Sequence, residues 1–286
     1  MDYVNPDALV STEWLANHLE SPDVRIVDCT WFMPGSGRQA AREFEEKHIP
    51  GAVRFDVDAI AEPGTDLPHM LPSQELFSSR VRKLGLGSGN RIICYDANGG
   101  HMAAMRVWWM FRVFGHDDVA VLNGGLPKWE LEGRPVSDLP APQRERHFQA
   151  IERHSLVRDL DQMKANVVSA KEQVVDARSS GRFIGTDPEP REGLKSGHIP
   201  GSLNLPFDRL LDLPGLGTVR PASELKAAFA DAGIDPARPV VTTCGSGITA
   251  AVIAFGLYLT GHREVAVYDG SWTEWASQDD TPVEAA

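Results

Sequence analysis

The residues with the clearest potential for chemistry lie in one short stretch, residues 240–250, which reads Val-Val-Thr-Thr-Cys-Gly-Ser-Gly-Ile-Thr-Ala. A β-branched run that ends on Cys244 predicts a buried parallel strand, and the glycine-rich turn after it predicts a loop into an apolar helix over 249–260. In α/β folds, ligands bind at the carboxyl ends of strands, where helix N-termini begin. Cys244 is therefore expected among backbone N–H groups that stabilise a thiolate, which makes its sulfur a candidate nucleophile.

Other interpretations of this stretch stay open. A cysteine at the end of a strand can be an inert core thiol, and it is the Gly-Ser-Gly turn with the helix behind it that favours reactivity. A phosphate-binding loop would also use the glycines, but the lysine of the Walker motif is missing. A phosphatase of the Cys-x5-Arg type would need a basic residue where this chain has Ala250.

Charge and composition restrict the classes of function. The 286 residues are 42% hydrophobic and 24% charged, which is ordinary for globular domains, and the net charge is −12. A negative chain is a poor general partner for nucleic acid or an anionic membrane. An anionic substrate would have to be captured by a local basic pocket.

Cysteine usage and the N-terminal sequence bear on the compartment. The chain has three cysteines, an odd number without a Cys-x-x-Cys pair, so neither a disulfide framework nor a zinc site is indicated. No signal peptide is recognisable at the N-terminus, and the longest apolar run, around residues 250–259, is too short to span a bilayer. These features predict a cytoplasmic protein in a reducing environment.

The elements that position Cys244 belong to an internal repeat. Five segments of the first half recur in the second half in the same order, at an offset of 146 to 150 residues. They are Val27-Asp28 with Val175-Asp176, His48-Ile49-Pro50-Gly51 with His198-Ile199-Pro200-Gly201, the helix from Ser73 with the helix 222–232, the strand 91–95 with the strand 240–243, and Asn123-Gly124-Gly125 with Asp269-Gly270-Ser271.

Alternating strands and helices predict an α/β fold with mainly parallel sheets flanked by helices. We therefore expect two tandem domains, over residues 1–135 and 154–286, joined by a polar, proline-bearing linker over 136–153. Within the first domain the pattern predicts helices over 11–19, 40–47, 73–84, 102–114 and around 128–132, and strands or extended segments over 24–28, 53–57, 91–95 and 119–122.

The two halves differ at the nucleophile. The position that matches Cys244 is Asp96, and an aspartate cannot act as a thiol. The first domain is thus expected to keep the fold without the catalytic group, and to form one wall of a cleft between the domains.

Taken together, these motifs resemble the two-domain rhodanese superfamily over nearly the full length. The resemblance is carried by the loop Cys244-Gly245-Ser246-Gly247-Ile248-Thr249, by the paired His-Ile-Pro-Gly motifs, and by the segment 181–191, Gly-Arg-Phe-Ile-Gly-Thr-Asp-Pro-Glu-Pro-Arg. Thiosulfate-using members of the superfamily typically place basic residues just after the cysteine, whereas mercaptopyruvate-using members place Gly-Ser-Gly or Gly-Thr-Gly there. This chain has the second form.

The resemblance implies roles for individual residues. Cys244 would attack the donor sulfur and become a persulfide, while Arg182 and Arg191 would bind the carboxylate and ketone of an α-keto acid, a task suited to the guanidinium fork. The family's proposed Ser-His-Asp relay would fall on Ser246, His69 and Asp58. Backbone groups of the loop would contact the transferred sulfur, from Gly245, Gly247, Ile248 and Thr249.

Several charged residues near these motifs have structural interpretations. Asp56 competes with Asp58 for the relay position because the two are predicted on the same face of a strand. His48 and His198 are taken as structural, since each repeat has one before its Pro-Gly turn. Partners for the two arginines in plain surface ion pairs would be Asp187, Glu189 and Glu192.

The implied reaction is a two-step sulfur transfer that needs no metal or organic cofactor. Sulfur would pass from 3-mercaptopyruvate to the cysteine, with release of pyruvate, and then to thioredoxin, a small thiol or cyanide. Neither nucleic acid nor a membrane is expected as a partner. The alternatives are a thiosulfate sulfurtransferase and a non-catalytic rhodanese-like module that binds partners or senses redox state.

Overall fold

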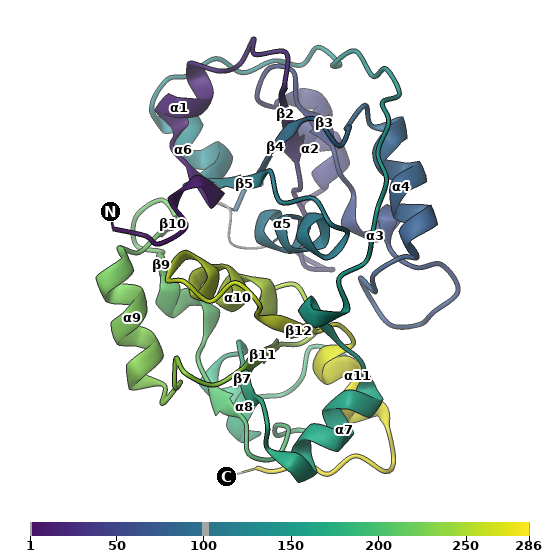
Figure 1. The fold of residues 1–286 in the computed structure, drawn as a ribbon, viewed down its shortest axis with the longest axis vertical. Coiled ribbons are helices and arrows are strands. Elements are labelled where there is room, and N and C mark those ends of the chain that lie inside the picture. The colour runs from purple at the N-terminus through teal and green to yellow at the C-terminus, as the bar shows by residue number, and fades with distance from the viewer. Residues whose placement is uncertain (1, 99–102, 286) are drawn as a thin grey trace.

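A five-stranded parallel sheet forms the centre of the first half of the chain (Figure 1). Its strands lie in the order β1-β5-β4-β2-β3. The computed structural model describes residues 2–98 and 103–285. The strands are β1 (Leu9–Val10), β2 (Val24–Asp28), β3 (Val53–Arg54), β4 (Arg91–Tyr95) and β5 (Val119–Leu122).

The second half builds the same sheet again, in the order β6-β12-β11-β7-β8, so each strand occupies the place of its counterpart in the first half. A short antiparallel pair, β9 and β10, forms a separate sheet. The predicted α/β class, with two mainly parallel sheets flanked by helices, is confirmed. These strands are β6 (Val157–Arg158), β7 (Gln173–Asp176), β8 (Leu203–Asn204), β9 (Leu211–Asp212), β10 (Thr218–Val219), β11 (Val240–Thr243) and β12 (Ala266–Tyr268).

Helices pack on both faces of each sheet because successive residues of a buried parallel strand point to opposite sides. In β4, Ile93 packs into one apolar cluster with α1 and α6, while Ile92 and Cys94 pack into a larger cluster with α4 and α5. The helices are α1 (Thr12–Ala16), α2 (Ala40–Glu46), α3 (Val57–Ile60), α4 (Gln74–Lys83), α5 (Ala104–Val113), α6 (Gly125–Leu131), α7 (Leu160–Ser169), α8 (Ser180–Ile184), α9 (Ala222–Asp231), α10 (Ala250–Leu259) and α11 (Ser271–Ser277), with short 3-10 turns at 6–8, 154–156 and 207–210.

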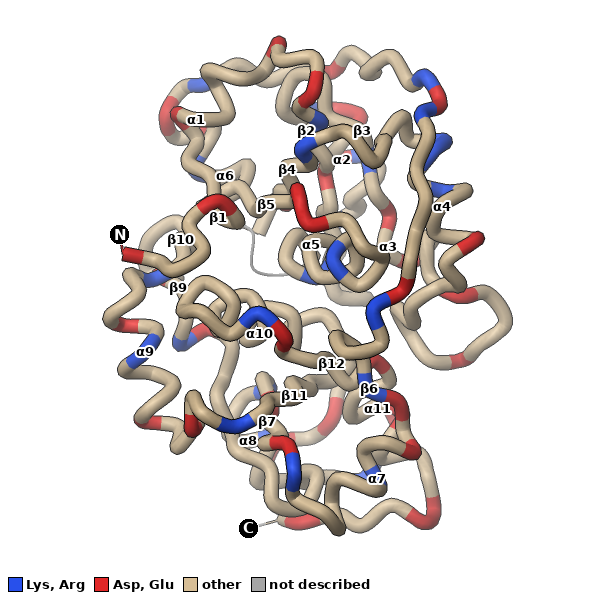
Figure 2. The backbone as a smooth tube through the Cα atoms, viewed as in Figure 1, with Lys and Arg blue, Asp and Glu red and all other residues tan. Residues whose placement is uncertain are grey.

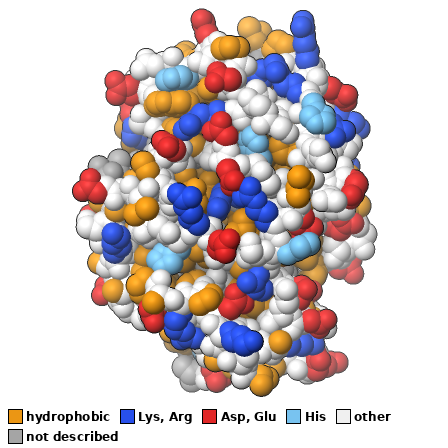
Figure 3. Space-filling view, in the orientation of Figure 1, with side chains coloured by type: hydrophobic (Ala, Val, Ile, Leu, Met, Phe, Trp, Pro, Cys, Tyr) orange, Lys and Arg blue, Asp and Glu red, His pale blue; other side chains and the backbone are white. Residues whose placement is uncertain are grey.

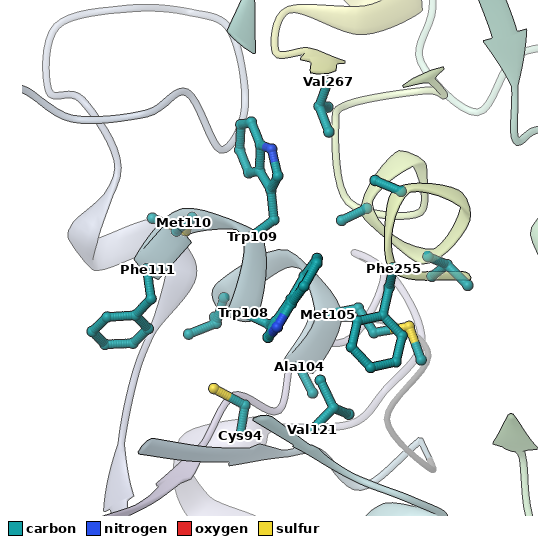
Figure 4. Close-up of a cluster of buried hydrophobic side chains, with 14 of the residues drawn as sticks. Cys94, Ala104, Met105, Trp108, Trp109, Met110, Phe111, Val121, Phe255 and Val267 are labelled. Atoms are coloured by element: carbon teal, nitrogen blue, oxygen red, sulfur yellow. The ribbon is translucent and has the colours of Figure 1, made fainter. Parts of the chain in front are cut away.

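The two domains meet through α5 and α10, which lie side by side in Figure 1. All of α5 is buried, and so is all of α10 apart from Tyr258. The Trp108 ring stands edge-on to the Phe255 ring, with centroids 4.8 Å apart (Figure 4). α10 is apolar all round, as expected of a helix in the interior, whereas α5 also buries Arg106 and Arg112. Each helix is covered by its own sheet and by the other domain.

The segment between the domains is nearly free of helix and strand from residue 132 to residue 153. It packs along the first domain, where Arg82 donates to the Phe148 carbonyl and the Ala150 N–H donates to Ser78. The boundaries at 135/136 and 153/154 stay a prediction.

Some local predictions were wrong at their edges. The helix expected over 11–19 ends at Ala16, and the one expected around 128–132 begins three residues earlier, at Gly125. The segment 53–57 is a strand only at 53–54. Asp56 then caps α3, with its carboxylate accepting from the N–H groups of Asp58 and Ala59. Met102, at the start of the helix expected over 102–114, lies outside the described residues.

Charged residues of both signs are spread over both domains (Figure 2). On the face shown in Figure 3, acidic and basic side chains are interspersed among apolar ones. Among the residues described here, no helix combines the length and the apolar character needed to cross a membrane.

Candidate active site

Cys244 lies directly after β11, and its side chain is buried, with 2% of the residue exposed. The loop that follows leads into α10, as predicted. A segment after β12 holds the Cys244 backbone: the Trp272 N–H donates to its carbonyl at 2.9 Å, and the Cys244 N–H donates to Ser271 Oγ at 3.3 Å. The next residue, Gly245, has its carbonyl bonded by both the N–H and the hydroxyl of Thr273. Cys244 thus stands on a fixed backbone.

Glycine lets the loop pack closely at two places, and at one of them, Gly247, it is required. Gly247 has φ +80°, and a Cβ on it would lie 2.9 Å from the Asp269 carbonyl oxygen. A Cβ on Gly245 would lie 3.1 Å from Nη2 of Arg182. The absence of side chains therefore allows the loop to approach both the neighbouring segment and the guanidinium.

A cavity of about 330 Å³ opens beside Cys244, with walls from both domains. Trp31 and Met33 come from the first domain, and the remaining wall comes from the second. A cavity of about 350 Å³ within the first domain is similar in size, but its described lining has no cysteine or histidine. The cavity beside Cys244 is lined by Trp31, Met33, Ala177, Arg178, Ser179, Arg182, Pro190, Arg191, Phe207, Cys244, Gly245, Ser246, Ile248 and Thr249.

The arginine expected to bind substrate, Arg182, is already paired. Its Nη2 lies 2.6 Å from Oε2 of Glu189, whose side chain is 3% exposed. Glu189 also binds the buried Arg178 at 2.7 Å, and Arg178 in turn grips Asp176 through Nε and Nη2. Two cations and two carboxylates therefore alternate along one chain of contacts, and their charges cancel.

Arg191 differs from Arg182 in having no ion-pair or hydrogen-bond partner among the described residues. It lines the same cavity and is partly exposed. Its positive charge is therefore available to an anion in the cavity. Glu189, one of the acidic partners considered from the sequence, forms ion pairs with Arg182 and Arg178. Within the described chain it forms none with Arg191.

His69 and Asp58 are in contact, 11 residues apart in the chain. His69 Nδ1 lies 2.5 Å from Asp58 Oδ1, and the Trp31 indole donates to the other carboxylate oxygen at 2.9 Å. The bond from His69 holds the pKa of Asp58 below its ordinary value. Asp58 lies within α3, so the prediction that it shares a strand face with Asp56 was wrong.

The far nitrogen of His69, Nε2, is buried and has no hydrogen-bond partner among the described residues. The His69 backbone is held in the left-handed region, with φ +62°, and the side chain is 3% exposed. Ser246 lies on the cavity wall, but no hydrogen bond links it to His69 in the described part of the chain. The structure thus forms the Asp58–His69 contact of the implied relay and leaves the Ser246–His69 contact open.

The matching loop of the first domain is filled by its own carboxylate. Asp96 is fully buried, and it accepts from the N–H groups of Asn98, Ala103 and Ala104 at 2.8 to 3.2 Å. Residues 99–102 of this loop lie outside the described residues. A carboxylate bonded to loop N–H groups occupies the kind of site that an anionic sulfur would need.

The two repeat histidines bind backbone groups. His48 contacts the Phe44 carbonyl through Nδ1 and the Leu139 carbonyl through Nε2. His198 contacts the Phe183 carbonyl, and it pairs with Glu284 in an isolated bridge. Both histidines therefore stabilise the turns before their Pro-Gly motifs through backbone contacts. Neither lines the cavity beside Cys244.

Sequence reasoning missed several residues around this cavity. Trp31, Met33 and Phe207 supply its apolar walls, and they carry no local motif that would mark them. Asp269 and Ser271 belong to the last repeated segment, so comparison of the two halves was the signal that could have identified them. Among the described residues, no group of three or more His, Cys, Asp or Glu side chains is placed to hold a metal ion.

Comparisons with known proteins find relatives over nearly the full length of the chain. The family model for the rhodanese-like domain matches residues 11–132 and 159–278. A mitochondrial thiosulfate/3-mercaptopyruvate sulfurtransferase of Arabidopsis thaliana is 42% identical over 98% of this chain and 78% of its own length. A thiosulfate sulfurtransferase of Cricetulus griseus is 44% identical over 95% of this chain and 92% of its own. A crystal structure from Escherichia coli, described as a 3-mercaptopyruvate sulfotransferase, superposes with a TM-score of 0.84 at 35% identity, covering 93% of this chain and 98% of that one.

Proposed function

The chain belongs to the rhodanese family, and from that premise we propose that it moves sulfur from 3-mercaptopyruvate through a persulfide on Cys244 to a thiol acceptor. That it is a sulfurtransferase follows from its full-length relatives. The observation that carries the proposed donor is the cavity beside Cys244, in which Arg191 is a cation without a partner among the described residues.

Cys244 is the proposed nucleophile. Its thiolate attacks the donor sulfur, the carbon–sulfur bond breaks, and the bond electrons leave on the enolate of pyruvate, which takes up a proton. The persulfide that forms carries its outer sulfur in the cavity, where loop N–H groups can stabilise negative charge. Support comes from the first domain, where the equivalent loop binds the Asp96 carboxylate through three N–H groups.

Arg191 and Arg182 are proposed to bind the α-keto acid. Arg191 offers a guanidinium without a partner in the described part of the chain, and this group can hold a carboxylate through two parallel bonds. Arg182 shares its charge with Glu189 and lies against Gly245, so it suits the neutral ketone oxygen near the sulfur. One uncompensated cation favours a monoanionic donor over the thiosulfate dianion.

His69 is proposed to handle the proton that the leaving enolate requires. Asp58 holds one ring nitrogen, and this fixes the ring with Nε2 as the free position. Ser246 would join the relay when substrate occupies the cavity, because catalytic hydrogen bonds often tighten only in the complex.

A thiosulfate donor is the second candidate, since a relative 44% identical to this chain bears that name. The acceptor proposed is a low-molecular-weight thiol, thioredoxin or cyanide, whose attack on the outer sulfur releases the Cys244 thiolate. We place the enzyme in a reducing compartment such as the cytoplasm because Cys29, Cys94 and Cys244 are all free thiols.

Steady-state kinetics test the proposal. The wild type, Cys244→Ser and the matched thiol control Cys94→Ala are assayed with 3-mercaptopyruvate and with thiosulfate, using cyanide as acceptor and reading pyruvate and thiocyanate. We expect a larger kcat/KM for 3-mercaptopyruvate, abolished by Cys244→Ser and kept by Cys94→Ala. Preference for thiosulfate would assign the second candidate. A folded wild type inactive with both donors would favour a binding module.

A further inference from the structure

Ser271 has a backbone conformation that serine seldom adopts. It is fully buried, it begins α11, and its φ is +50°, in the left-handed region. The first domain has the same conformation at the matching position, where Gly125 has φ +54°. The chain therefore repeats the backbone geometry but uses the unstrained residue in the domain that lacks Cys244.

The hydroxyl of Ser271 makes two contacts that glycine cannot make. Oγ accepts the N–H of Cys244 at 3.3 Å and donates to the Tyr268 carbonyl at 2.9 Å. The neighbouring contact, from the Trp272 N–H to the Cys244 carbonyl, does not need a side chain. The first domain has that neighbouring contact too, from the Leu126 N–H to the Asp96 carbonyl.

The contact to the carbonyl is thus common to both domains, whereas the contact from the Cys244 N–H depends on a hydroxyl that Gly125 cannot supply in the first domain. We propose that Ser271 is a positioning residue for sulfur transfer: its hydroxyl fixes the peptide before Cys244 and so directs Sγ toward the cavity. The proposal rests on the proposed function in taking Cys244 as the nucleophile. Small displacements of a reacting atom are enough for a large loss of rate, since a shift of about 1 Å can reduce turnover about 100-fold.

A purely structural role predicts the opposite preference. If Ser271 served only the fold, glycine at this position would relieve the left-handed strain, as Gly125 does in the first domain. Strain kept beside a reactive group is a signal of function when a specific contact depends on the residue that bears it. Here that contact is the hydrogen bond to the Cys244 N–H.

Three variants separate the two roles. Ser271→Gly removes the hydroxyl and the strain, Ser271→Ala removes the hydroxyl and keeps the strain, and the matched control Gly125→Ser adds strain to the first domain. The measurements are kcat and KM for 3-mercaptopyruvate, the thermal midpoint, and the rate at which iodoacetamide alkylates Cys244, followed by mass spectrometry of its peptide. Alkylation does not depend on which sulfur donor the enzyme uses.

We expect both Ser271 variants to lower kcat and the alkylation rate by about 10-fold to 100-fold, with KM within about twofold of wild type. The thermal midpoint of Ser271→Ala should be lower than that of Ser271→Gly. Gly125→Ser should have a lower thermal midpoint than wild type, with an unchanged kcat and an unchanged alkylation rate of Cys244.

Wild-type kcat and alkylation in Ser271→Gly would overturn the proposal, and so would an equal loss of kcat in Gly125→Ser. If Ser271→Gly does not fold, the same comparison is made with Ser271→Ala. A wild type inactive with 3-mercaptopyruvate, combined with slow alkylation in the Ser271 variants, would reject the proposed function and leave this inference standing.

Discussion

Arg182 and Arg191 line one cavity but differ in what already neutralises them. Arg182 is bound by the buried Glu189, whereas Arg191 has no partner among the described residues. In the proposed mode of donor binding, removing Arg191 takes away one charge-assisted contact with the donor. Removing Arg182 also leaves the Glu189 carboxylate beside an anionic substrate with only Arg178 to balance it.

Arg191→Met is therefore expected to raise KM for 3-mercaptopyruvate about 10-fold to 100-fold, the equivalent of one charged hydrogen bond. Arg182→Met should lower kcat/KM further than Arg191→Met does. Adding Glu189→Gln to Arg182→Met should recover part of the lost kcat/KM. The measurement is kcat/KM of the single and double variants. Equal effects of the two arginine variants, without recovery in the double variant, would contradict the assignment.

The sequence was sufficient for residues whose partners are local and insufficient for those whose partners are distant. Cys244 and its loop are contiguous in the sequence. Arg182 and Glu189 are seven residues apart, so both lie in the one segment 181–191 that the sequence analysis selected. Asp58 was harder to assign, because the short helix that carries it begins inside an apparent strand. The contact of Arg106 with the Gly247 carbonyl spans 141 residues, and no local pattern indicates it.

At the scale of elements, capping residues set helix ends more accurately than apolar periodicity did. Ser73, at which a helix was predicted to begin, caps α4: its Oγ accepts the Leu76 N–H at 3.2 Å. Ser11 caps α1 in the same way, but α1 stops at Ala16 although the apolar pattern continues. Beyond that point the chain turns toward β2, so packing rather than propensity decides where the helix ends.

The ends of α1 and α6 are joined by Glu132. Its carboxylate accepts from the Thr12 hydroxyl at 2.6 Å and also binds Lys128 and Arg134. These contacts lower the pKa of Glu132 to about 2 from an ordinary value of 4.5, with the Lys128 bond as the largest cause. Because the folded-state pKa is the lower one, this contribution to stability is complete above about pH 4.5 and is lost as the pH falls toward 2.

Glu132→Gln is accordingly expected to lower the thermal midpoint at pH 7 and to lose less stability than wild type between pH 5 and pH 3. Glu20→Gln, at an exposed glutamate outside the ion pairs of the described chain, is the control and should follow the wild-type curve. Thermal melts at half-unit steps of pH measure both. A wild-type pH dependence in Glu132→Gln would show that the contacts do not stabilise the fold.

At the scale of the whole molecule, the first domain, which lacks Cys244, contributes to the site through Arg106. This arginine of α5 is fully buried, and its guanidinium donates to the carbonyls of His69, at 2.6 Å, and Gly247, at 3.3 Å. It also forms an ion pair at 2.6 Å with Asp269, whose second oxygen accepts the Leu71 N–H. The buried pair of Arg106 and Asp269 thus connects the segment of the first domain that carries His69 and Leu71 with the loop that follows Cys244 in the second domain.

Arg106→Met is expected to destabilise the protein by about 3–5 kcal/mol, because it leaves the Asp269 carboxylate buried without its cation. Replacing both partners, as Arg106→Met with Asp269→Leu, should recover most of that stability, since apolar pairs of similar volume often substitute for buried ion pairs. It should not recover kcat, because the His69 carbonyl and the Leu71 N–H have both lost their partners.

Denaturant unfolding and steady-state kinetics of the single and double variants separate these effects. Stability restored together with kcat would mean that the pair serves only the fold, and that the first domain aligns His69 through the apolar contact of α5 with α10 alone. Stability restored while kcat stays low would assign the pair to the alignment of the two loops. A domain that has Asp96 in place of a nucleophile would then be retained because the reacting cysteine needs its histidine held from the other side.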